Sequence, residues 1–400
     1  MNRHRNMFSD KTMSDLKTLE KLEIDIRAKS KKDIMFGEGY KYLINLSSLN
    51  IGLCYIQVFV DRKIFQFMPL LTNISFDMHC RMSIFPGGHQ SLQSVRQLYV
   101  HHLISVQNLS YFNSFTNELK RTPIETLTFQ KTFPNSLDYF PWNPISESFY
   151  NSSLKKLRMT GNKLYESFSS SKLNAPPSSL QELNLSSNRL YMFVLDLGNI
   201  RKLNLQKNLL GAFLSSHRYK RSRTINSKLE YIDLSMNHIE KLTFRIFQGQ
   251  PNLKYINLSR NKLQKMTFRV SRLHYLRYLN LSTNNFTTLD KNAMENFDVL
   301  SKKTSFIVNL RNNALHCTCK TLPFLKWTTK TKVDVLINDN CTLGDGTIVS
   351  FSSIDSIIQQ LQKGCTTYTS LIIGLTTVLA VILAVVVFAL VYKYRWIEML

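Results

Sequence analysis

Four cysteines toward the C-terminal end of the chain are the residues best suited to covalent or metal chemistry. One residue separates Cys317 from Cys319, and Cys341 and Cys365 follow at wider intervals. Zinc sites usually show closely spaced ligand pairs on both sides. The wide second spacing therefore favours disulfide bonds, and we expect no metal. Four cysteines allow three connectivities, and spacing alone does not choose among them.

A second set of residues has types suited to binding. Tyr231, Tyr255 and Tyr278 occupy the same outward position in three successive copies of a repeated sequence, and Lys156 and Arg158 lie on the same face further back. Adjacent strands lie about 4.8 Å apart, so the tyrosine rings would form a ladder. Tyrosine is a favoured contact residue at interfaces. The ladder therefore either contacts a ligand or packs neighbouring coils, and both interpretations stay open.

The net charge is +24, with a pI near 9.8. Such a charge is typical of a protein with an acidic partner such as nucleic acid, or of one whose lysines and arginines only solvate its surface. Because the basic residues are spread along the chain, we favour the second interpretation. The densest cluster is Arg218–Arg223, in a segment suited to anion binding, protease cleavage or simple solvation.

No group of residues predicts catalysis. His101 and His102 have no carboxylate or cysteine at a telling spacing, and the sequence has no phosphate-binding glycine loop and no GxSxG. We therefore expect neither an enzyme nor a cofactor.

A repeated phrase defines the elements that would position these residues. It reads Leu180-x-x-Leu183-x-Leu185-x-x-Asn188-x-Leu190, the template of a leucine-rich repeat. Alternate leucines of a short strand point inward, and the asparagine satisfies backbone groups where the chain leaves the strand. Stacked coils then give an α/β leucine-rich-repeat solenoid, a curved horseshoe with a parallel sheet. The phrase returns from Ile200, Leu229, Leu253 and Leu276, and ends as Val308-x-Leu310-x-x-Asn313-x-Leu315.

Upstream of Leu180 the phrase weakens. The copy from Leu154 is nearly intact, whereas those from Ile124 and Val95 keep the apolar positions without the asparagine. Weaker candidates begin at Leu71, Lys41 and Leu19, for roughly twelve coils in all. We thus expect degenerate repeats over 1–153, regular repeats over 154–316 and a cysteine-rich cap over 317–366, since terminal coils need capping. Cys54 and Cys80 either pair or are core thiols.

An uncharged apolar segment follows the cap. Residues 371–391 are long enough to cross a hydrocarbon core of about 30 Å as one transmembrane helix. Lys393 and Arg395 come directly after it, so the positive-inside rule predicts a type I topology. The repeats would then lie outside the cell or in a lumen, with 392–400 as a short cytosolic tail.

Disulfides and an outer location agree, because disulfide bonds persist in oxidising compartments. Candidate N-glycosylation sites, which all lie on the proposed outer side, give weaker support: Asn45, Asn73, Asn108, Asn151, Asn184, Asn257, Asn280, Asn285 and Asn340. The N-terminal residues have no apolar core and no cleavage motif, so they do not predict a signal peptide. With the short tail, this leads us to expect a fragment or shortened product of a longer receptor.

Several of these sequences resemble the ectodomain of Toll-like receptors. They are LEYIDLSMNHI, LKYINLSRNKL, LRYLNLSTNNF, NLRNNALHCTC, PFLKW, the two later cysteines and YKYRW after the apolar segment. The resemblance extends from Leu154 to Trp396. It implies that Cys317 pairs with Cys341 and Cys319 with Cys365, and that the ectodomain dimerises on binding a ligand.

The same resemblance implies a receptor of innate immunity in the plasma membrane or an endosome, with a protein, lipid or nucleic acid ligand. The family's cytosolic signalling domain is not found in this sequence, so we expect the chain not to signal alone and to act as a decoy beside a full-length receptor. The alternative is a transmembrane adhesion or guidance protein that uses the same repeats to bind another protein.

Overall fold

The computed structural model describes residues 13–25, 36, 38–52, 57–76, 81–84, 86–101, 109–132, 142–165, 176–193, 197–216, 227–338 and 340–397. Cys54, Cys80, His102 and Asn108 lie outside these residues, as does the basic segment Arg218–Arg223.

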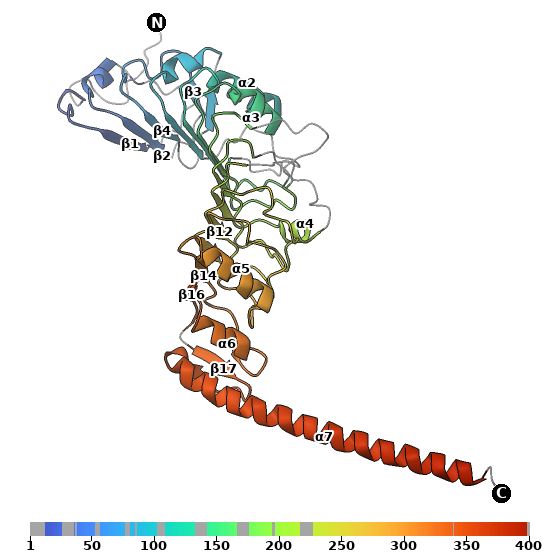
Figure 1. Cartoon of the computed structure of the whole chain (residues 1–400). Helices are drawn as coiled ribbons and strands as arrows, with labels where there is room; N and C mark the ends of the chain where they lie inside the picture. The colour runs from blue at the N-terminus through green and yellow to red at the C-terminus, as the bar shows by residue number, and fades with distance from the viewer. Residues whose placement is uncertain are drawn as a thin grey trace.

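One curved sheet runs through the described part of the chain and confirms the leucine-rich-repeat solenoid (Figure 1). It has thirteen strands, each paired in parallel with its neighbours. The strands are β1 (Lys21–Asp25), β2 (Ser48–Gly52), β4 (Asn73–Phe76), β6 (Gln97–His101), β7 (Thr126–Gln130), β8 (Lys156–Thr160), β9 (Glu182–Asn184), β10 (Lys202–Asn204), β11 (Tyr231–Asp233), β12 (Tyr255–Asn257), β13 (Tyr278–Asn280), β14 (Ile307–Asn309) and β16 (Asp334–Leu336).

The segments between these strands return along the other side of each coil. Two of them, β3 (Gln57–Val60) and β5 (Arg81–Ile84), form a small parallel sheet of their own. The others include short helices, of which α2 and α3 lie side by side in Figure 1. The helices are η1 (Glu38–Tyr42), η2 (Gly88–Leu92), α2 (Leu109–Leu119), α3 (Trp142–Phe149), α4 (Gly211–Ser215) and α5 (Lys291–Ser301).

The repeated leucines form a continuous core between the two sides. In the coil of β9, Leu183, Leu185 and Leu190 are each at most 1% exposed, and the equivalent residues of the other coils are also buried. No coil has enough apolar surface to bury these side chains alone, so each depends on its neighbours.

A ladder of buried asparagines joins consecutive coils at the turn that follows each strand. The side-chain oxygen of Asn188 accepts the backbone N–H of Asn162 at 2.8 Å, and its nitrogen donates to the carbonyls of Met159 and Leu185, each at 2.8 Å. Each asparagine thus bonds the coil before it as well as its own. The ladder consists of Asn162, Asn188, Asn208, Asn237, Asn261, Asn284 and Asn313.

The residue before each ladder position has a left-handed backbone conformation, which is costly for any residue but glycine. Only Gly161 is a glycine in this set. The bonds of the asparagine that follows hold the turn in this shape. The other residues of the set are Lys131, Ser187, Lys207, Met236, Arg260, Thr283 and Asn312, with φ between 48° and 57°.

Two features of the N-terminal coils differ from the sequence pattern. The strand of the second coil is β2, so the apolar positions of this repeat begin at Leu46. The predicted start at Lys41 is therefore wrong, because Lys41 lies in η1. In the coil of β7, Thr132 stands at the ladder position: its N–H donates to Asn162 Oδ1 at 2.7 Å and its hydroxyl to the carbonyl of Val100 at 3.1 Å. A hydroxyl group can therefore replace the amide.

Two disulfides cross-link the cap, and a polar contact joins it to the repeats. Disulfides join Cys317 to Cys341 and Cys319 to Cys365, the pairing that the family resemblance implies. Trp327 Nε1 donates to both carboxylate oxygens of Asp298 in α5, each at 3.0 Å. The cap also supplies β16, which extends the main sheet. Its other elements are β15 (His316–Cys317), α6 (Leu322–Thr328), β17 (Asn340–Leu343), β18 (Ile348–Ser350) and η4 (Phe351–Ser353).

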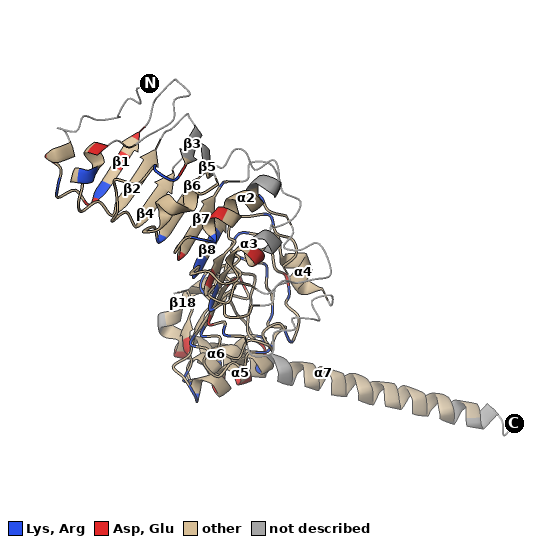
Figure 2. Ribbon diagram, turned by 90° about the horizontal axis from the view of Figure 1, so that it is seen from above, with Lys and Arg blue, Asp and Glu red and all other residues tan. Residues whose placement is uncertain are grey.

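The final helix, α7 (Ile354–Ile397), begins within the cap and projects away from it (Figure 1). Ile357 is buried against the cap, and Cys365 lies on this helix. Side chains 371–391 are all exposed, and Figure 2 shows this part of α7 without charged residues. Within the described residues, α7 is the one helix long and apolar enough to cross a membrane.

We expect Asn237→Ala to lower the free energy of unfolding by about 3 kcal/mol. Asn237 is fully buried and bonds the carbonyls of Leu205, Leu234 and Ser235 and the N–H of Leu210, so its loss leaves several buried backbone groups unpaired. Urea denaturation measures the change. Asn285→Ala, at an exposed asparagine, should change it by less than about 0.5 kcal/mol. Equal effects of the two substitutions would contradict the role of the ladder.

Candidate functional site

The three predicted tyrosines form a stack on the concave face of the sheet. Register places Tyr231 beside Tyr255 and Tyr255 beside Tyr278. Their ring centroids are 4.6 Å and 5.0 Å apart, with planes 9° and 8° from parallel. All three side chains are partly exposed. The stack thus presents ring edges and hydroxyl groups rather than open ring faces.

Residues at the same position of successive strands form a column across the sheet. Polar side chains of the column two residues further along the strands fix the two ends of the stack. The Tyr231 hydroxyl donates to Asp233 Oδ2 at 3.4 Å, and Asn257 Nδ2 donates to the same oxygen at 3.0 Å. At the other end, Asn309 Nδ2 donates to the Tyr278 hydroxyl at 3.2 Å. The rings are therefore held in place before any ligand arrives.

Burial and a neighbouring negative charge raise the pKa values of Tyr231 and Tyr255. Burial raises the pKa of Tyr231 far above its usual range, and the Asp233 carboxylate and Tyr255 raise it further. Burial also raises the pKa of Tyr255, with contributions from Tyr278 and Asp233. The phenols of Tyr231 and Tyr255 therefore remain hydrogen-bond donors throughout the physiological range.

The column that contains the three tyrosines continues toward the N-terminal coils with residues of alternating charge. Lys156, Glu182 and Lys202 stand in register on β8, β9 and β10, and Glu182 lies 3.5 Å from Lys156 Nζ and 3.2 Å from Lys202 Nζ. Lys156 therefore does not face the concave side as a free cation. Arg158, two residues after Lys156 on β8, is exposed, and no ion pair forms at it within the described residues.

A second carboxylate neutralises basic residues beside the stack. Glu230 lies between Arg201 and Lys254, with Lys254 Nζ at 2.7 Å. The hydrogen bond from Lys254, followed by that from Arg201, lowers the pKa of the Glu230 carboxyl group. Sequence reasoning missed Glu182, Glu230 and Asp233. For Glu182 and Glu230 the signal is their position relative to the repeat, since each occupies a strand or pre-strand position whose neighbours in the adjacent coils are basic. Asp233 lies between Asn204 and Asn257 of the adjacent coils and carries no such signal.

The structure divides the candidate glycosylation sites into two groups. Asn184, Asn257 and Asn280 lie on the strands, where each side-chain oxygen accepts the N–H of the serine two residues later. Asn73 lies partly buried at the start of β4. The exposed group consists of Asn45, Asn151, Asn285 and Asn340.

Comparison with known proteins identifies the repeats. Family models described as leucine rich repeat match residues 227–271 and 275–297. The Toll-like receptor 4 of Pinctada imbricata is 28% identical over 258 residues, which are 61% of this chain and 29% of that protein. The chain therefore spans less than a third of the length of this relative.

Two solved structures have partial similarity to the fold. One is the complex of TLR13 with ssRNA13, at 16% identity and a TM-score of 0.44, covering 83% of this chain and 56% of that one. The other is the Toll–Spätzle complex of Drosophila, at 17% identity and a TM-score of 0.47, covering 85% of this chain and 40% of that one.

The repeats, the parallel sheet and the disulfide-bonded cap together define a leucine-rich-repeat solenoid with a C-terminal cap. The similarity to Toll-like receptor 4 confirms the resemblance to Toll-like receptors that the repeat and cap motifs predicted.

We expect the stability of the solenoid to fall as pH rises above about 10, the ordinary tyrosine pKa. The raised pKa values of Tyr231 and Tyr255 mean that the unfolded chain loses these protons first, so the stability they contribute is present below that pH and is lost above it. Unfolding free energies measured across this range check the slope. The double variant Tyr231→Phe, Tyr255→Phe should flatten it, and an unchanged slope would contradict the assignment.

Proposed function

We propose that this chain is the ligand-binding ectodomain and membrane anchor of a receptor of innate immunity, and that the ligand contacts the concave face at Tyr231, Tyr255 and Tyr278. The observation that carries the proposal is the tyrosine stack, whose rings and hydroxyl groups are already ordered. Ordering side chains before binding lowers the entropy cost of association, and tyrosine is enriched among residues that dominate binding energy.

Other bonds already join the coils that carry the stack. Asn261 and Asn284 bond the main chains of these coils at the turns after the strands, and the strands pair along their length. The stack is thus not the contact that holds the coils together. This supports a role at the surface over the alternative that the rings only pack neighbouring coils.

The flanking charges suit a ligand with polar or anionic groups. Arg158 is the exposed cation among the predicted ligand contacts, whereas the positive charge of Lys156 is offset by Glu182. We therefore assign Arg158 a larger role in binding than Lys156. A binding screen would determine whether the ligand is a protein, a lipid or a nucleic acid.

We further propose that α7 spans a membrane once, with the repeats outside the cell or in a lumen. The support is the exposed, uncharged segment 371–391, followed in sequence by Lys393 and Arg395. From the resemblance to Toll-like receptors, we propose that the partner within the membrane is a second copy or a full-length receptor of this kind.

A receptor fusion tests the concave site. With a signal peptide added in front and the cytosolic domain of a Toll-like receptor behind, we expect the chain to drive a reporter in response to a microbial protein, lipid or nucleic acid preparation. Tyr255→Ala should then weaken the response about tenfold or more, as expected when a central contact residue is truncated.

The matched control is Tyr275→Ala, because Tyr275 is 58% exposed and lies outside the concave stack. Surface display of an N-terminal tag shows that each variant reaches the membrane. A response that Tyr255→Ala and Arg158→Gln leave unchanged would contradict ligand contact at this face.

Glycan mapping tests the topology. We expect N-glycans at Asn285 and Asn340, because both are exposed, and lower occupancy at Asn257, whose amide donates to Asp233. Mass spectrometry of the membrane-bound chain before and after glycosidase treatment measures the occupancy at each site. A chain inserted in membranes without any glycan at the exposed asparagines would contradict the outer location.

A further inference from the structure

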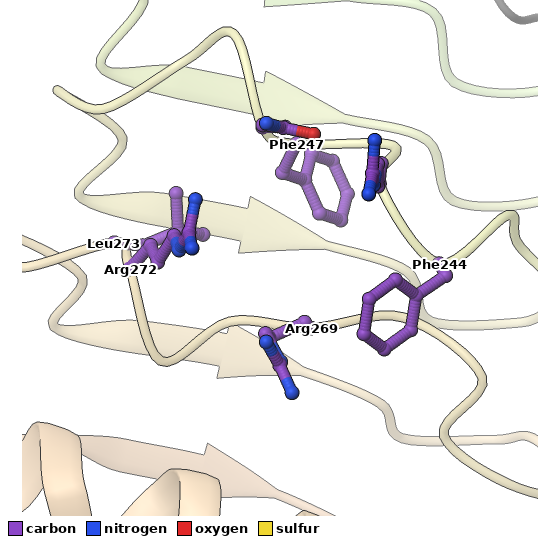
Figure 3. Close-up of a pocket in the computed structure, with 7 residues that line it drawn as sticks. Phe244, Phe247, Arg269, Arg272 and Leu273 are labelled. Carbon is purple, nitrogen blue, oxygen red and sulfur yellow. The ribbon is translucent and has the colours of Figure 1, made fainter.

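A pocket on the convex side of the solenoid lies apart from the concave tyrosine stack. It is formed by two loops, one between β11 and β12 and the other between β12 and β13, which face each other in Figure 3. Its volume is about 140 Å³. The lining residues are Phe244, Arg245, Phe247, Gln248, Arg269, Arg272 and Leu273.

The floor of the pocket is rigid. Phe247 and Leu273 are each 3% exposed, and the Phe247 ring contacts Phe268 edge-on at 5.6 Å between centroids. The Arg269 N–H donates to the carbonyl of Phe244 at 3.2 Å, which joins the two loops directly. The relative position of the two loops is therefore set by the stacking of the coils.

The rim of the pocket combines positive charge with an exposed aromatic ring. Arg245, Arg269 and Arg272 are exposed, and the Arg269 guanidinium lies 4.9 Å from the centroid of the Phe244 ring. Phe244 nevertheless remains 53% exposed, so ring surface is open to a ligand. An aromatic face beside guanidinium groups can accept a flat ring by stacking.

No carboxylate lines this pocket, and none of its three arginines forms an ion pair with any described residue. Four basic residues on or next to the strands of the main sheet differ, since Lys156, Lys202, Arg201 and Lys254 each lie against Glu182 or Glu230, whereas Arg158 there has no ion pair among the described residues. Three guanidinium groups around one cavity repel one another, and an anion with more than one negative charge would relieve that repulsion.

We propose that this pocket binds a phosphate monoester carried on an aromatic or heteroaromatic ring. A phosphate monoester has nearly two negative charges at neutral pH, and guanidinium groups bond its oxygens in pairs. The ester group sits among Arg245, Arg269 and Arg272, and the ring packs on Phe244. The site is separate from the ligand contact proposed for the concave face, so either can fail without the other.

Titration calorimetry of the full chain in detergent, with phenyl phosphate, inorganic phosphate and benzoate as probes, tests the proposal. We expect phenyl phosphate to bind more tightly than both other probes. Arg269→Gln should weaken its binding about tenfold, the effect of losing one charge-assisted hydrogen bond. Phe244→Leu should reduce phenyl phosphate to the affinity of inorganic phosphate and leave inorganic phosphate unchanged.

The matched control is Arg311→Gln, since Arg311 is also exposed and forms no ion pair with the described residues but lies outside the pocket. It should leave all three affinities as they are. Equal losses from Arg269→Gln and Arg311→Gln would show binding to diffuse surface charge and overturn the proposal. Benzoate binding as tight as phenyl phosphate, or no phenyl phosphate binding at millimolar concentration, would also overturn it.

Discussion

The buried asparagine ladder is the interaction on which the rest of the solenoid depends. Every turn after a strand leaves backbone N–H and carbonyl groups inside the protein, where an unpaired group is costly. A side-chain amide has two donors and an acceptor, and Asn188 uses them to satisfy its own coil and the one before it. The ladder thereby sets the spacing of the coils and also holds the left-handed residues that turn the chain into the convex side.

Because the coils are evenly spaced, residues at the same repeat position line up in columns across the concave face. Strand register aligns Lys156, Glu182 and Lys202 and then the three tyrosines, so a residue's chemistry is decided by its neighbours in adjacent coils. Charge therefore cancels locally at Glu182 and Glu230 even though the whole chain is strongly basic. On the convex side, the same stacking brings Arg245 of one loop toward Arg269 of the next without a carboxylate.

The sequence predicted the features that depend on periodicity. The regularly spaced leucines and the asparagine locate the strands from Leu154 onward, because the leucines form the core and the asparagine bonds the backbone at the turn. The pattern of apolar residues gave a wrong repeat start at Lys41, where the coil has a helical turn before its strand. The same pattern could not show that Thr132 takes the place of an asparagine. The left-handed residues carry no signal either, since Lys207, Met236 and Arg260 have little in common as amino acids.

The candidate site was predictable only as far as it lies within one column. The tyrosines share a repeat position, so their alignment follows from sequence alone. Their partners belong to another set of aligned positions: Asp233 lies two residues after Tyr231 on the same strand, whereas Asn309 belongs to the next coil, so its pairing with Tyr278 needs the register of the sheet. Similarly, the apolar segment marks the part of α7 that suits a bilayer, but not that the helix begins at Ile354 inside the cap.

The disulfide between Cys319 and Cys365 has a consequence for orientation. It attaches the cap to a helix that continues without a break to Ile397, and residue 371, where the apolar segment starts, comes less than two turns after Cys365. A solenoid joined in this way cannot swivel on a flexible tether. Each residue of an α-helix advances the direction of its side chains by about 100°. With α7 across a membrane, as proposed above, the number of residues between Cys365 and the apolar segment would fix which way the horseshoe opens over the membrane plane. A single insertion there would turn the concave face toward a different set of neighbours without altering any residue of it.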